Sequence, residues 1–104
     1  MTDRNKVGKV LGKDISCLYA RILYMHDDYI SVVGEDYKRM IKIMFADYNL
    51  KSVEVYHDRS LIAKLSWSRR LVGARIEGSK LALYADNDGF LEINMRSGTI
   101  SGRI

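Results

Sequence analysis

The chain has no proline and only one cysteine among its 104 residues, and each shortage excludes a class of structure. Without proline, the turns must be made by glycine, asparagine, aspartate and serine. A lone Cys17 cannot form an internal disulfide, so a fold held together by disulfides is excluded, and we expect a buried, structural thiol. No uncharged run approaches the roughly 18 residues that span a bilayer, and no signal-peptide pattern opens the chain. We therefore expect a cytoplasmic protein without membrane attachment.

Apolar residues make up 47% of the chain and charged residues 29%, which is the balance of a folded globular protein. The length fits one domain covering residues 1–104. The net charge of +4 is spread over both halves of the chain and permits an anionic partner without requiring one. The N-terminal region is the exception, because it contains four basic residues and only one acidic residue. We expect residues 1–13 to form a basic, partly flexible N-terminal segment. The basic residues are Arg4, Lys6, Lys9 and Lys13, relieved only by Asp3.

Turn-forming residues recur about every ten positions along the rest of the chain, as in Gly34-Glu35-Asp36 and Asn87-Asp88-Gly89. This spacing is typical of short antiparallel strands joined in sequence order. We therefore predict an all-β fold, a compact antiparallel meander of about eight to ten short strands that forms a small barrel or sandwich.

Apolar and polar residues alternate through the second half of the chain, which is the pattern of strands with one wet face. The predicted inward residues are Leu61, Ala63, Leu65, Trp67, Val72, Ala74, Ile76, Leu81, Leu83, Ala85, Leu91, Ile93, Met95, Ile100 and Ile104. Three predicted turns keep these residues on one face of the sheet. A turn at Gly78-Ser79 pairs Ile76 with Leu81, and Asn87-Asp88-Gly89 forms a three-residue loop. A turn at Ser97-Gly98 pairs Met95 with Ile100 and Leu91 with Ile104. The agreement between turn chemistry and alternation is the main support for the fold class.

The first half is less regular. Residues 38–46 alternate, with Ile41, Ile43 and Phe45 predicted inward. Residues 17–25 are apolar on both sides, which favours a strand buried on two faces, although a helix over residues 14–25 also fits the spacing.

Catalytic signatures are absent from the sequence, since it contains no nucleophile elbow, no zinc-binding helix motif and no dinucleotide-binding loop. His26 and His57 each stand beside an acid, but both lie in predicted turns, where polar residues are expected. We therefore expect no enzyme activity, no cofactor and no metal.

Arg69 and Arg70 follow Trp67 at a predicted hairpin end, and arginine beside an aromatic residue suits nucleic-acid binding. Trp67 has inward parity, however, and is predicted to lie in the core. A four-residue loop over residues 68–71 would set Lys64 opposite Arg75, and a three-residue loop at Asp58-Arg59-Ser60 would place Glu54 on the other side of Lys64. Glu54, Lys64 and Arg75 would then form an ordinary ladder of surface charges across three strands.

Six of the seven tyrosines lie in the first 56 residues, where core and cross-strand packing explain Tyr19, Tyr24 and Tyr29. Met40 and Met44 share the outward parity of Lys38 and Lys42, and exposed apolar residues on a charged face favour an interface. The sequence thus predicts a non-catalytic module that binds a protein partner or copies of itself, with nucleic-acid binding as the alternative. The candidate contact residues are Arg69, Arg70, Tyr37, Tyr48, Lys38, Lys42, Met40 and Met44.

Overall fold

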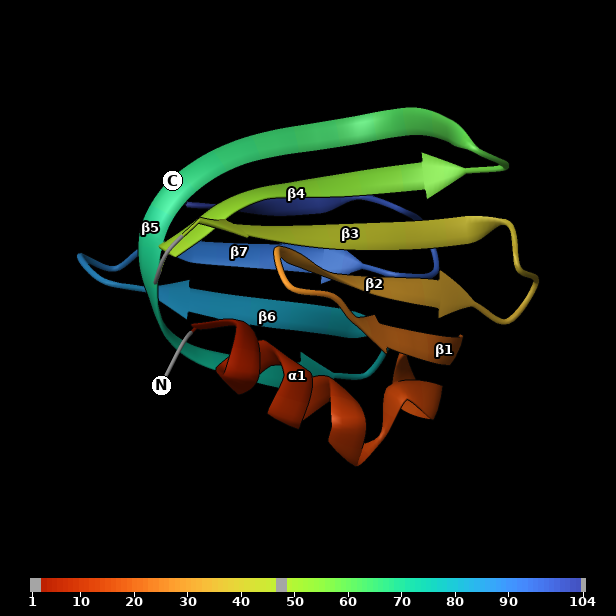
Figure 1. Ribbon diagram of the computed structural model, residues 1–104, viewed down its shortest axis with the longest axis horizontal. Helices are drawn as coiled ribbons and strands as arrows, with labels where there is room; N and C mark the ends of the chain where they lie inside the picture. The colour runs from red at the N-terminus through yellow and green to blue at the C-terminus, as the bar shows by residue number, and fades with distance from the viewer. Residues whose placement is uncertain (1–2, 47–48, 104) are drawn as a thin grey trace.

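The computed structural model describes residues 3–46 and 49–103 and contains one antiparallel meander in which each strand pairs with the next in sequence (Figure 1). The strands are β1 (Ala20–Met25), β2 (Tyr29–Gly34), β3 (Arg39–Ala46), β4 (Asn49–His57), β5 (Ser60–Glu77), β6 (Lys80–Ala85), β7 (Phe90–Asn94) and β8 (Ile100–Arg103). Helix α1 (Asp3–Lys13) and the 3₁₀ helix η1 (Ile15–Leu18) precede them. The predicted all-β antiparallel fold is confirmed, and the sheet is an open one that does not close into a barrel.

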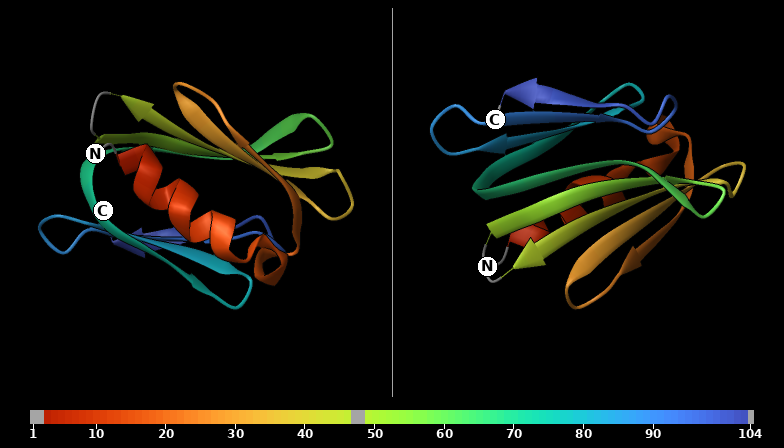
Figure 2. Two further views of the ribbon diagram at one scale, coloured as in Figure 1. Left: turned by 60° about the horizontal axis from the view of Figure 1, so that its bottom comes forward. Right: turned by 90° about the horizontal axis from the view of Figure 1, so that it is seen from above.

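Strand β5 connects two layers, because its first part pairs with β4 up to Arg70 and its second part pairs with β6 from Leu71 onward. The strand curves around one side of the molecule, so that β1 to β4 form one layer and β6 to β8 the other (Figures 1 and 2). The predicted hairpin at residues 68–71 is therefore wrong, and so is the pairing of Lys64 with Arg75. Ser68 and the two arginines after it resemble a turn locally, but Arg69 and Arg70 pair with the start of β4, and the strand runs through them.

The inward face carries the core between the two layers. Ile41, Ile43 and Phe45 of β3 are buried as predicted, and Trp67, only 2% exposed, is in the core. Leu61 and Val72 were predicted inward but are exposed, because each lies at a register shift in β5. A bulge adds one residue to one strand and thereby moves the following side chains to the other face.

The hairpin turns keep the predicted parity but not always the predicted register. The Gly78-Ser79 turn pairs Ile76 with Leu81, as expected. Around Asn87-Asp88-Gly89, Leu83 pairs with Leu91 rather than Ile93, because the Ala85 N–H donates to the Gly89 oxygen at 2.8 Å and centres the loop on Asn87 instead of Asp88.

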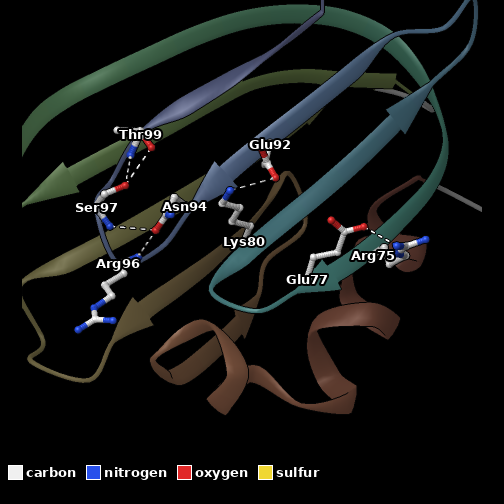
Figure 3. A network of polar contacts seen from close by, with 8 residues as sticks. All are labelled: Arg75, Glu77, Lys80, Glu92, Asn94, Arg96, Ser97 and Thr99. Carbon is white, nitrogen blue, oxygen red and sulfur yellow. Dashed lines mark hydrogen bonds and ion pairs between the residues drawn. The ribbon is translucent and has the colours of Figure 1, made fainter.

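The predicted two-residue turn at Ser97-Gly98 is also wrong, since Ile100 pairs with Ile93 and not with Met95. The side chain of Asn94 accepts hydrogen bonds from the backbone N–H groups of Arg96 and Ser97, which holds a longer loop (Figure 3). In both hairpins the shift is two residues, so the apolar face is unchanged. The predicted partner Ile104 lies outside the described residues.

Helix α1 occupies the N-terminal segment that the charges suggested would be a solvated tail. Val7 and Leu11 are completely buried, and the helix lies between the two layers, mainly against β5 (Figure 2). It therefore fills the opening left where β1 and the second half of β5 do not pair. The local sequence is a weak helix former, with glycine at positions 8 and 12, so its stability comes from docking.

Residues 14–25 divide between two structures, since η1 is followed by the predicted strand, β1. Cys17 lies in η1 and is exposed, which corrects the expectation of a buried thiol. Its Sγ donates a hydrogen bond to Asp14 Oδ2 at 2.9 Å, and this bond raises the pKa of the thiol.

Candidate interaction surface

The outer face of the first layer carries a continuous row of apolar side chains across five strands. Cross-strand pairing joins each residue directly to the next, so all of them point to the same side of the sheet. This apolar row consists of Ile22, Val33, Met40, Tyr56 and Leu61. The solvent face of an antiparallel sheet is usually polar, so a row of this kind marks a surface available for contact.

The next row along the strands combines charge with aromatic contacts. Lys42 Nζ lies 5.3 Å from the ring centres of both Tyr29 and Tyr56, within cation–π range. Glu54 accepts a hydrogen bond from the Tyr56 hydroxyl at 3.1 Å and lies 3.7 Å from Lys64 Nζ. Burial and this hydrogen bond together raise the pKa of the Tyr56 hydroxyl.

Large side chains also cover the small residues of this face. Ser31 and Ser52 lie on the outer side yet are only 4% and 5% exposed, because larger neighbours overhang them. His26 stacks on Tyr29 with ring centres 4.2 Å apart, and Tyr24 beside it is half exposed. The outer face is thus a packed surface in which the apolar row lies beside a row of charged and aromatic side chains.

The corresponding face of the second layer carries ion pairs beside one aromatic pair, Tyr84 and Phe90. Arg75 pairs with Glu77 and Lys80 with Glu92, and the adjoining loop is held by polar contacts of Asn94 (Figure 3). Because both layers bury their inner faces in one core, the contrast between the outer faces does not follow from folding alone.

The structure brings together some of the candidate contact residues. Met40, Lys42 and Met44 alternate along the outer face of β3, and all three are half-buried. Lys38 is exposed just before β3, and Tyr37 is 64% exposed in the same turn with a positive φ of 60°.

The two arginines lie elsewhere. Arg69 and Arg70 pair with the start of β4, whereas the apolar row crosses its far end. Leu61 and Arg69 are eight positions apart along β5, or about 25 Å of extended strand. Arg69 Nη1 donates to the backbone oxygen of Asp86 at 3.2 Å, which ties it to the β6–β7 loop. Tyr48, also a candidate, lies outside the described residues.

Sequence reasoning missed Ile22, Val33, Tyr56 and Leu61 as members of this surface. The alternation of residues 38–46 did identify Met40 and Met44 as outward, but apolar neighbours on other strands are found only once the register is known. Tyr24 and Tyr29 lie on this face and make cross-strand contacts, as expected, although Tyr24 remains half exposed.

Within the described residues, no cluster of His, Cys, Asp or Glu side chains could hold a metal ion. In the same part of the chain, neither helix has the length and hydropathy to cross a bilayer. Comparison with known proteins finds no matching family model, no matching curated protein and no matching solved structure.

Proposed function

We propose that this protein is a non-catalytic assembly module whose first layer binds a second copy of the chain through its outer face. The apolar row carries the proposal, because five neighbouring strands contribute to it and Leu61 remains 51% exposed. Tyrosine and methionine are enriched at protein interfaces, and this face contains both.

A second copy fits this face because the surface is complementary to itself. In a two-fold contact the same patch is used by both copies, and residues on either side of the axis exchange places. An axis running between β3 and β4 along the strands would set Met40 of each copy against Tyr56 of the other. In the next row, Lys42 would face Glu54 of the other copy, so unlike charges meet where the apolar row ends.

The size of the row sets the expected affinity. Five strands spaced at about 4.8 Å extend roughly 19 Å, which is small for a protein interface. Contacts below about 1,200 Å² of total buried area are typical of weak association. We therefore expect a dimer whose population depends on protein concentration.

Sedimentation equilibrium over a range of concentrations tests the proposal. Leu61→Glu places a charge in the row without disturbing the core, and is expected to weaken association at least about tenfold, or roughly 1.4 kcal/mol. Val72→Glu is the matched control, since Val72 is a similarly exposed apolar residue of β5 outside the row. A wild-type protein that stays monomeric at all concentrations, or equal loss in both variants, would refute the proposal.

A charge exchange tests the position of the axis. Lys42→Glu or Glu54→Lys alone is expected to weaken the dimer, because each places like charges opposite one another. The double variant reverses both charges and is expected to restore association toward the wild-type value. If the double variant is weaker than either single variant, the two copies do not meet in this way.

A further inference from the structure

Helix α1 carries a basic stripe made of Lys6, Lys9 and Lys13. With 3.6 residues per turn these three lysines share one flank, next to the face on which Val7 and Leu11 are completely buried. The lysines line a groove of about 240 Å³ between α1 and β5, and its remaining lining residues are Val10, Gly73 and Ala74. The basic stripe therefore borders a small apolar floor.

The three lysines of the basic stripe differ from Lys64 and Lys80 of the sheet, which each lie beside a glutamate. None of the ion pairs in the described part of the chain involves these lysines. Lys6 Nζ lies 3.5 Å from the backbone oxygen of Leu71, beside the exposed Arg70. Like charges three or four residues apart destabilise a helix slightly, so an anionic ligand along this flank would relieve the repulsion.

The surroundings of the groove distinguish between kinds of anion. A helix that binds a membrane surface inserts its apolar face, but α1 has buried that face in the core. Gly73 of the groove lining pairs with Tyr84 of β6, whose ring lies on the outer face of the second layer, 3.9 Å from where a Cβ of Gly73 would be. Tyr84 also contacts Phe90, with ring centres 5.4 Å apart, so a half-buried aromatic pair lies beyond Gly73 from the basic stripe.

We propose that this surface binds single-stranded nucleic acid, with phosphates along the basic stripe and a base against Tyr84. Binding of single strands without sequence preference combines a basic groove for the backbone with aromatic rings for stacking. This site is separate from the apolar row, which lies on the outer side of the first layer while α1 packs against the inner side (Figure 2).

Fluorescence anisotropy with a short labelled oligothymidylate, measured between about 50 and 200 mM KCl, tests the proposal. The triple variant Lys6→Gln/Lys9→Gln/Lys13→Gln removes three phosphate contacts. The logarithm of the binding constant should then fall less steeply with the logarithm of salt, by about 2, since each contact on a single strand contributes about 0.7. Tyr84→Leu is expected to weaken binding several-fold while leaving the salt slope unchanged.

The matched control is Lys38→Gln/Lys51→Gln/Lys64→Gln, which removes the same charge elsewhere and should leave most of the slope intact. Circular dichroism establishes that each variant keeps its fold. The proposal is overturned if the wild type does not bind at low salt, if both triple variants lose binding equally, or if polyglutamate or phosphatidylserine vesicles compete as well as the oligonucleotide. Leu61→Glu should bind this oligonucleotide as the wild type does, so failure of the assembly proposal leaves this test intact.

Discussion

Truncation of Leu11 measures whether α1 is part of the folded core or a solvated segment. Leu11 is completely buried between the helix and the sheet layers. Replacing it with alanine removes the transfer free energy of the side chain and leaves a cavity, and such changes cost about 2–5 kcal/mol. A helix at the opening of the sheet can partly collapse onto the gap, so we expect a cost of about 3 kcal/mol for Leu11→Ala.

Urea unfolding followed by fluorescence is a suitable assay, because Trp67 is the one tryptophan of the chain and is buried. With a denaturant dependence of about 1.5–2 kcal/mol/M for a domain of this size, the midpoint should fall by about 1.5–2 M. Gly12→Ala is the control, since a Cβ there meets no other atom within 4 Å and the residue is helical. It should stabilise the protein by about 0.5–1 kcal/mol.

These two variants separate the alternatives. If residues 1–13 formed a solvated, partly flexible segment, both substitutions would leave the free energy of unfolding nearly unchanged. If Leu11→Ala costs less than about 1 kcal/mol, the helix is not docked, and the groove beside the basic stripe does not exist as described.

Two further outcomes follow from local geometry. Asp58 and Arg59 both have positive φ, 51° and 71°, as in the type I′ turns that favour glycine at the second position. Arg59→Gly should relieve roughly 1 kcal/mol of strain and raise the Tm by about 4 °C in calorimetry, and an unchanged or lower Tm would contradict this. Because the hydrogen bond to Asp14 raises the pKa of the Cys17 thiol, less thiolate is present near pH 8. Iodoacetamide should therefore modify Cys17 more slowly than an unstructured thiol, and Asp14→Asn should accelerate the reaction, whereas equal rates by mass spectrometry would exclude the effect.

The sequence predicted strands and their inward faces where alternation and turn chemistry agree. At Gly78-Ser79 both the parity and the register are confirmed, because a two-residue turn leaves no freedom in the pairing. In the β6–β7 and β7–β8 hairpins the hydrophobic pattern fixed only the parity, and a shift by two residues satisfies it equally well. A longer loop held by the Asn94 side chain set the register of the β7–β8 hairpin, whereas backbone hydrogen bonds between Ala85 and Gly89 and between Gly89 and Asp86 set that of the β6–β7 hairpin.

The larger errors come from contacts distant in sequence. Helix α1 has few apolar residues and two glycines, and only the opening between the layers gives Val7 and Leu11 a place to be buried. Strand β5 continues through Ser68 and the two arginines because β4 and β6 both pair with it. The bulge near Ile62 sends Leu61 outward, and so a residue predicted for the core completes the apolar row.

The two proposed surfaces have a joint consequence, because they lie on different sides of the first layer. A dimer formed through the apolar row would leave the α1 helix of each copy accessible, so one long strand of nucleic acid could contact two basic stripes. The second contact is then intramolecular and raises the apparent affinity by more than either site alone provides. Long oligonucleotides should therefore bind the wild type more tightly than Leu61→Glu at concentrations where the wild type dimerises, while short ones should not distinguish them. Equal affinities for the long strand would show that the dimer does not present both helices to one ligand.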